Sequence, residues 1–228
     1  RNPNPEASEI EASFNAVSQI CLEAASHKLK KPAWQKMVTQ VITKGFCRRS
    51  HFRVIVGAEV LRNVGYLAQE LLDLNYQPAE LKEGTFTARE LKDVGFTAQR
   101  LHDLGYIPRE MFEADIPAQD MKDLRYTAKE LHIGGYQAMQ LREAKYTLVE
   151  LKLGKYKVQD LKTAGFRLPD LRHARFTASD VRRSQVFTPA EMHGAGYKAV
   201  EMKGAGFDAR KLKDAGYSAT ETTEAGFT

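Results

Sequence analysis

The chain has 228 residues, of which 43% are apolar and 28% are charged, a composition typical of folded proteins and unlike that of disordered ones. No apolar run reaches the roughly 20 residues that a membrane-spanning helix needs. We therefore expect a soluble, intracellular protein without membrane insertion. An organellar location, for example mitochondrial, is compatible with these residues, and a targeting peptide or further repeats could lie outside them.

The N-terminal part, residues 1–55, is predicted to form about three helices that cap the structure that follows. Asn4 and Pro5 have the character of a helix start, and Pro32 can begin a second helix with Trp34 on its apolar face. The third helix is predicted from about Ser50 to Asn63. Cys21 and Cys47 lack the spacing of a metal or redox motif, which favours buried, reduced thiols.

The net charge of +5 is concentrated in this N-terminal part. Between Ala24 and Ala58 there is no acidic residue, and the bases within residues 27–53 are Lys28, Lys30, Lys31, Lys36, Lys44, Arg48, Arg49 and Arg53. With Trp34, Phe46 and Phe52 among them, these bases form a candidate site for RNA or another polyanion. Solvated, charge-rich helix faces are the commoner explanation of such a run.

Residues 56–228 consist of a ten-residue repeat with the consensus [FY]-T-A-x-E-L-K-x-A-G, in about 17 units with one inserted residue near Gln185. We number the aromatic residue as position one. A Leu, Met or Val occupies position six in every complete unit except the last, where Thr222 replaces it. Such a register predicts one structural unit per repeat.

Each position of the repeat suits a two-turn helix. Thr or Ser at position two with Glu or Asp at position five forms a capping box, predicted for Thr87/Glu90, Thr127/Glu130, Thr147/Glu150, Thr177/Asp180, Thr188/Glu191 and Ser218/Glu221. Proline is tolerated at position three, the first helical residue, as in Pro78, Pro108 and Pro189. Glycine at position ten supplies the left-handed residue that ends a helix, and Arg125, Lys145, Lys155 and Arg175 are expected to adopt the same conformation.

The predicted fold is an all-α solenoid of ten-residue, single-helix repeats. Helices this short are unstable alone, so their stability must come from stacking. The aromatic residue should contact the position-six residues of its own and the preceding helix, which gives a core built from Tyr126, Leu131, Tyr136, Leu141, Tyr146 and Leu151. The spacing leaves open whether one helix or two form a layer. A β-helix of pentapeptide repeats is disfavoured because position four holds long polar side chains such as Arg89, Gln99 and Lys129.

The array resembles the tandem decapeptide repeats of the AG[FY][ST]AxELKx type found in proteins of protists and algae, most closely between Ala205 and Thr228. This resemblance implies a helical scaffold and no particular activity.

We find no catalytic, cofactor or metal motif, and therefore expect a protein that is not an enzyme and has no small-molecule substrate. The scattered histidines, including His102, His132, His173 and His193, are expected on the solvated surface. Bases at position seven would align into a stripe that could follow a phosphate backbone, although helix dipoles alone favour bases there and the acids at position eight oppose the stripe.

Two functions remain. The first is a structural scaffold that binds other proteins of a multi-subunit complex. The second is an RNA-associated subunit of a ribonucleoprotein, such as an organellar ribosome, that uses the basic N-terminal patch.

Overall fold

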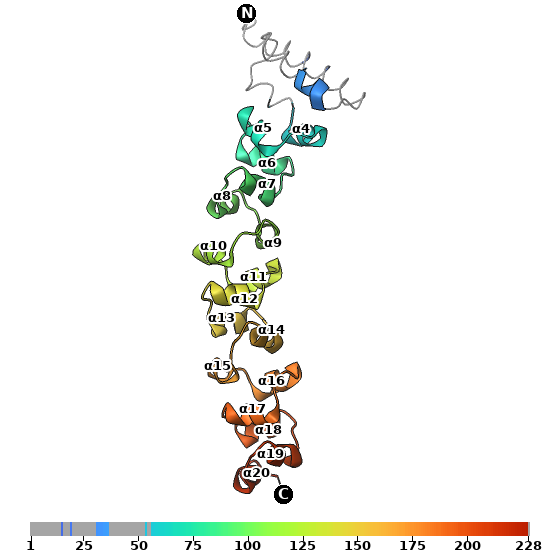
Figure 1. The fold of residues 1–228 in the computed structure, drawn as a ribbon. Helices are drawn as coiled ribbons and strands as arrows, with labels where there is room; N and C mark the ends of the chain where they lie inside the picture. The colour runs from blue at the N-terminus through green and yellow to red at the C-terminus, as the bar shows by residue number, and fades with distance from the viewer. Residues whose placement is uncertain (1–14, 16–18, 20–30, 37–52, 54–55, 228) are drawn as a thin grey trace, which may run out of the picture. The chain divides into compact units, whose positions relative to one another are not determined.

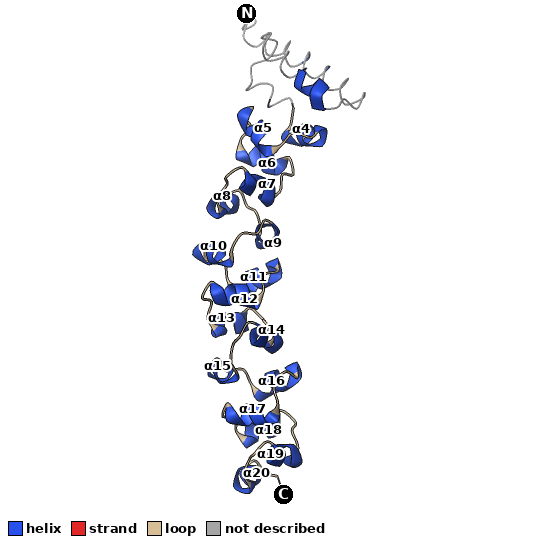
Figure 2. Ribbon diagram, viewed as in Figure 1, coloured by secondary structure: helices blue, strands red, loops and turns tan. Residues whose placement is uncertain are grey.

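The computed structural model describes residues 15, 19, 31–36, 53 and 56–227, and all regular structure among them is helical (Figure 2). The chain forms two compact units, residues 1–106 and residues 107–228. The first contains α4 (Ala58–Val64), α5 (Ala68–Asp73), α6 (Pro78–Glu83), α7 (Ala88–Asp93) and α8 (Ala98–Asp103) (Figure 1).

The second unit continues the same pattern at the same spacing (Figure 1). Its helices are α9 (Pro108–Glu113), α10 (Ala118–Asp123), α11 (Ala128–Gly134), α12 (Ala138–Glu143), α13 (Leu148–Leu153), α14 (Val158–Thr163), α15 (Leu168–His173), α16 (Ala178–Ser184), α17 (Pro189–Gly194), α18 (Ala199–Gly204), α19 (Ala209–Asp214) and α20 (Ala219–Glu224). Each begins at position three of a repeat, which confirms one helix per decapeptide.

The helix starts are capped as the sequence predicts. All six predicted capping boxes are present. In α11, the Glu130 amide donates to Thr127 Oγ1 at 3.3 Å, and the Thr127 amide donates to Glu130 Oε2 at 2.7 Å. In most repeats where position two lacks a hydroxyl, the position-five residue still accepts from the backbone, as Glu110 does from the Ile107 amide at 2.8 Å. Position five therefore caps most helices of the array.

The helix ends also follow the prediction. Gly135 has φ 99°, and Arg125, Lys145, Lys155 and Arg175 have φ between 60° and 65° at the equivalent position. The inserted residue is absorbed in a loop: Gln185 takes the left-handed conformation after α16, Val186 is the extra residue, and Thr188 caps α17. The helical register therefore survives the insertion.

Helices two repeats apart form the main contacts within each unit. In the second unit α11 packs on both α9 and α13, α12 packs on α10 and α14, and α18 packs on α16 and α20, while α4 packs on α6 in the first. Two consecutive helices therefore share a layer, and each layer spans two repeats. The spacing left open whether one helix or two form a layer, and the structure has two.

Tyrosine hydroxyls connect successive layers. Tyr136 donates to the Ile116 carbonyl at 2.8 Å, and Tyr156 donates in turn to the Tyr136 carbonyl at 2.8 Å, each across 20 residues. Between these bonds the position-six side chains are fully enclosed, Leu131 and Leu151 being 0% exposed. The predicted core is confirmed for Leu131, Tyr136, Leu141, Tyr146 and Leu151. Tyr126, predicted as part of it, is only half-buried.

Small residues at positions three and nine permit the close stacking. A Cβ placed on Gly154 would lie 2.9 Å from the backbone carbonyl carbon of Ala128, and one on Gly134 would lie 2.9 Å from that of Pro108. Position nine of one helix thus lies against position three of the helix one layer before. This close approach explains why the consensus has small residues at both positions.

The N-terminal part agrees with the sequence prediction in one place and differs in another. Residues 31–36 are helical, and Trp34 is 1% exposed, as predicted for a helix that begins near Pro32. The prediction of one helix from Ser50 to Asn63 is wrong, because Val56 and Gly57 are not helical and Gly57 is the N-cap of α4. The repeat register, with Val56 in the aromatic position, sets the start of α4. The helix predicted after Asn4, and both cysteines, lie outside the described residues.

The capping boxes predict a specific acid sensitivity. Hydrogen bonds from the Thr127 hydroxyl and amide lower the pKa of Glu130, and those from the amides and hydroxyls of Thr147 and Thr188 lower the pKa of Glu150 and Glu191. Because each folded pKa lies below the ordinary value of 4.5, the boxes stabilise fully above that pH and lose their contribution as the pH falls through the folded pKa values.

We expect the urea midpoint to be steady from neutral pH to about pH 5.5 and to fall progressively below about pH 4.5. Replacing Glu130, Glu150 and Glu191 by Gln should flatten this fall, because an amide oxygen can still cap, as Gln140 does for the Gln137 amide at 2.7 Å. An identical acid profile in the triple variant would contradict this assignment.

Candidate functional site

Most of the bases at position seven, which we call the position-seven row, reach along the stack to the end of the helix two repeats later. Lys82 Nζ donates to the Leu104 carbonyl at 2.8 Å, at the end of the helix two repeats later, and lies 4.6 Å from the ring centroid of Tyr106. Arg142 likewise donates to the Ala164 carbonyl at 2.6 Å and lies 5.3 Å from the Phe166 ring centroid. The further pairs are Lys122 with Lys145, Lys152 with Arg175, Lys162 with Val186, Arg182 with Ala205 and Lys203 with Gly226.

These contacts serve two purposes. The last carbonyls of a helix lack intrahelical donors and carry the negative end of its dipole. A cation there donates a hydrogen bond to a carbonyl and compensates the negative charge. The same cation lies over the face of the aromatic residue that follows, a favourable cation–π arrangement. The position-seven row therefore caps helix ends one layer away, which the sequence analysis did not foresee.

Two histidines in the row play the same part. His132 Nδ1 lies 2.7 Å from the Gly154 carbonyl oxygen, and the ring stacks on Tyr156 with centroids 4.3 Å apart. His193 contacts the Ala215 carbonyl oxygen at 3.1 Å and the Tyr217 ring at 4.1 Å between centroids. The prediction that these two are solvated surface histidines is wrong, because the neighbouring layer half-buries them.

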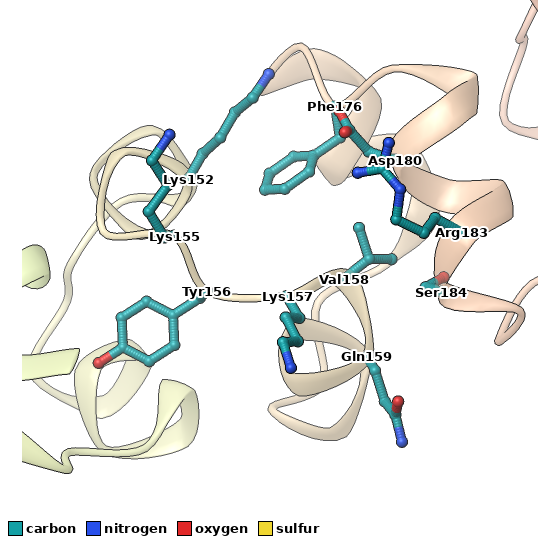
Figure 3. A pocket seen from close by; sticks show the side chains of 10 residues that line it. All are labelled: Lys152, Lys155, Tyr156, Lys157, Val158, Gln159, Phe176, Asp180, Arg183 and Ser184. Carbon is teal, nitrogen blue, oxygen red and sulfur yellow. The ribbon is translucent and has the colours of Figure 1, made fainter. Parts of the chain in front are cut away.

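A basic hollow opens beside α13, α14 and α16 (Figure 3). It has a volume of about 500 Å³, and its lining residues are Lys152, Lys155, Tyr156, Lys157, Val158, Gln159, Phe176, Asp180, Arg183 and Ser184. We keep the name basic hollow for this set. Four of these side chains are cations and one is an acid, so the hollow has a positive potential.

An exposed apolar patch lies on α11 and α13. Ile133 and Leu153 occupy position eight of these stacked helices and are 75% and 69% exposed, and Val149, one turn before Leu153, is 56% exposed. In several other repeats positions four and eight hold a polar pair, such as Gln119 Nε2 donating to Asp123 Oδ1 at 2.9 Å. We call Ile133, Val149 and Leu153 the apolar patch.

The predicted N-terminal polyanion site is only partly visible. Lys31 forms an ion pair of 2.7 Å with Glu70, and Arg53 forms one of 3.1 Å with Glu80. Lys36 is exposed, and Lys28, Lys30, Lys44, Arg48 and Arg49 lie outside the described residues. Two of the three described bases are thus engaged with acids of the array.

The repeat geometry agrees with a comparison against protein families. The model of the decapeptide repeat region matches residues 56–128 and 125–188, more than half of the chain. This chain belongs to the decapeptide-repeat family. Comparisons of this decapeptide-repeat protein with curated proteins and with solved structures found no match.

Among the described residues of this decapeptide-repeat protein, no three His, Cys, Asp or Glu side chains lie together as metal ligands would. The same part of the chain contains no helix with the length and apolar character needed to cross a bilayer. Most tyrosine hydroxyls of the described residues donate to backbone carbonyls two repeats earlier, although the buried Tyr66 hydroxyl has no partner among them. The capping carboxylates accept hydrogen bonds from their own N-cap residues, as Glu130 does from Thr127.

The capping role of the position-seven row makes a stability prediction. Replacing Lys82 by Met keeps the length of the side chain but removes the hydrogen bond to Leu104 and the cation over Tyr106. We expect a loss of about 1 kcal/mol in the free energy of unfolding, since the side chain is half-buried and partly screened. Lys129→Met, at the exposed position four, should cost almost nothing in the same urea titration. Equal effects of the two substitutions would contradict the assignment.

Proposed function

We propose that this decapeptide-repeat protein is a non-catalytic scaffold that binds a partner protein, as a subunit of a larger assembly. The proposal rests on how the repeat divides its positions. Positions one, three, six, seven and nine are used in stacking, and positions two and five mainly in capping. The positions left to vary on the surface are chiefly four and eight, and these are where a partner would be recognised.

The apolar patch is the single observation that carries the proposal. Ile133, Val149 and Leu153 are mostly exposed, and a polar pair at the same positions serves the fold elsewhere. Three large apolar side chains gathered on two stacked helices favour the burial of this surface by another protein. The RNA-associated alternative has less support, because Lys31 and Arg53 are engaged with Glu70 and Glu80.

The test replaces the apolar patch with residues that the repeat already uses. The variant Ile133→Asp/Val149→Gln/Leu153→Asp recreates at α13 the Gln–Asp pair of α10, so it should fold as well as the wild type. The control variant Ile107→Thr/Val200→Gln removes exposed apolar side chains elsewhere in the second unit.

Both variants and the wild type are used for affinity capture from native extract, with nuclease added, followed by mass spectrometry. We expect one or more proteins to be captured by the wild type and the control and lost with the triple variant. The same proteins captured by all three, or capture abolished by nuclease in every case, would overturn the proposal. Sedimentation velocity tells whether the patch binds a second copy of this chain instead.

A further inference from the structure

The basic hollow combines an apolar floor with a cationic rim. In Figure 3, Val158 and Phe176 lie between the cations of the α13 end, Lys152 and Lys155, and Arg183 of α16. Lys152 is already engaged, since it donates to the Arg175 carbonyl and lies 5.0 Å from the Phe176 ring centroid. The single acid, Asp180, accepts from the Thr177 amide at 3.0 Å and the Thr177 hydroxyl at 2.8 Å.

Three rim cations remain available. Lys155, Lys157 and Arg183 are exposed, and none has an ion pair or side-chain hydrogen bond with another residue in the described part of the chain. Asp180 offsets part of the Arg183 charge, since Arg183 is among the groups that lower the pKa of that carboxyl. The charges of Lys155 and Lys157 have no such partner among the residues that line the hollow. The preceding layer does not share these cations, because the positions 20 residues earlier hold Gly135, Gln137 and Thr163.

Two of these cations stand where the fold would prefer another residue. Lys155 is left-handed, with φ 65°, at the position where glycine avoids the steric cost. Lys157 is the N-cap of α14 and makes no side-chain cap, whereas Thr147 caps α13 by accepting from the Glu150 amide at 3.3 Å. Neither lysine side chain makes a contact that the stack requires, so both are available to a partner.

We propose that the basic hollow binds an acidic peptide segment of the partner protein, with apolar side chains on Val158 and Phe176 and carboxylates at Lys155, Lys157 and Arg183. Charge complementarity selects this occupant, and the apolar floor favours a peptide with large side chains between its acids. The inference rests on the proposed scaffold function and adds a second contact for the same class of partner.

The test uses two variants matched in position and charge. Lys155→Gly/Lys157→Thr alters the hollow, and Lys145→Gly/Lys198→Thr makes the same changes at position ten and position two elsewhere in the second unit. Lys145 is also left-handed, with φ 60°, and Lys198 also makes no side-chain cap. Both variants should therefore have a higher urea midpoint than the wild type, and both lose the same net charge.

The probe is a fluorescein-labelled twelve-residue peptide in which glutamates alternate with leucine and phenylalanine, and its control has Gln for Glu. Fluorescence anisotropy at low and rising salt should show binding of the Glu peptide alone, weakened by salt. Lys155→Gly/Lys157→Thr should weaken it about tenfold, and the matched control by less than about twofold.

Several results would overturn the inference: no binding of the Glu peptide at low salt, equal binding of the Gln peptide, or equal losses in the two double variants. Tighter binding of a twelve-nucleotide oligouridylate through the same two lysines would show that the hollow binds a polynucleotide and not an acidic peptide. If the Glu peptide fails while capture through the apolar patch persists, the hollow is refuted and the scaffold function stands.

Discussion

Replacing Tyr136 by Ala should lower the free energy of unfolding by about 3 kcal/mol or more, comparable with other buried aromatic truncations. The side chain is 1% exposed and lies over the core between α11 and its neighbours. Its hydroxyl donates to the Ile116 carbonyl. The Phe112 and Tyr136 rings contact each other edge to face, with centroids 5.1 Å apart. The substitution therefore opens a cavity and leaves a buried carbonyl without its donor.

Urea unfolding followed by circular dichroism measures the effect. The variant Tyr136→Phe separates the contribution of the hydroxyl from that of the ring. The Phe variant keeps the ring and loses only the hydrogen bond between layers, so it should cost about 1 kcal/mol. A loss well below about 1 kcal/mol for Tyr136→Ala would refute the core as described.

Replacing Gly154 by Leu should cost about 3 kcal/mol by forcing α13 away from α11. Even a Cβ at this position would lie 3.0 Å from the Ala128 Cβ and 2.9 Å from its carbonyl carbon, and the remaining leucine atoms have no space. The backbone itself is not the obstacle, because Gly154 has φ −69° and ψ −2°, which any residue can adopt.

Gly204→Leu, at position eight of its repeat, provides the control for a glycine that faces open space. This glycine ends α18, and a Cβ placed there has nothing within 4 Å. Leucine is a better helix former than glycine, so the substitution should be neutral or stabilise by up to about 1 kcal/mol. Equal destabilisation by the two leucines in thermal or urea unfolding would show that position nine does not contact position three one layer before.

The sequence was sufficient to predict the capping boxes and the left-handed helix ends, which a single repeat determines. Capping boxes such as Thr127 with Glu130 depend on residues three apart, and the left-handed conformation of Arg125 depends on its place at the helix end. These local rules hold whatever the helices pack against.

Features that join different repeats were harder to predict. A ten-residue period is the same whether one helix or two form a layer, so the bond from Tyr136 to Ile116 had no signal in the spacing. The position-seven row was interpreted as a surface stripe, because a lysine such as Lys82 shows its contact with Leu104 only after the layers are stacked. The regular recurrence of a base at position seven was a usable signal of this contact, since freely exposed positions vary more.

The surface sites were missed for a different reason. The apolar patch and the basic hollow consist of departures from the repeat, and Leu153 or Lys157 taken alone is only one irregular residue. Their significance depends on which irregular residues meet across layers, and the stacking of α11 with α13 and of α14 with α16 provides that information.

The stacking of each helix on the helix two repeats away is the central claim, and distances between spin labels test it most directly. With Cys21 and Cys47 replaced by Ser, nitroxides are attached in pairs at position eight: Ile133→Cys with Leu153→Cys, and Glu143→Cys with Leu153→Cys. Stacked helices lie roughly 8–10 Å apart, so the pair separated by 20 residues should show strong dipolar broadening, and the pair separated by ten residues should show less. The reverse order of the two distances would contradict the two-helix layer.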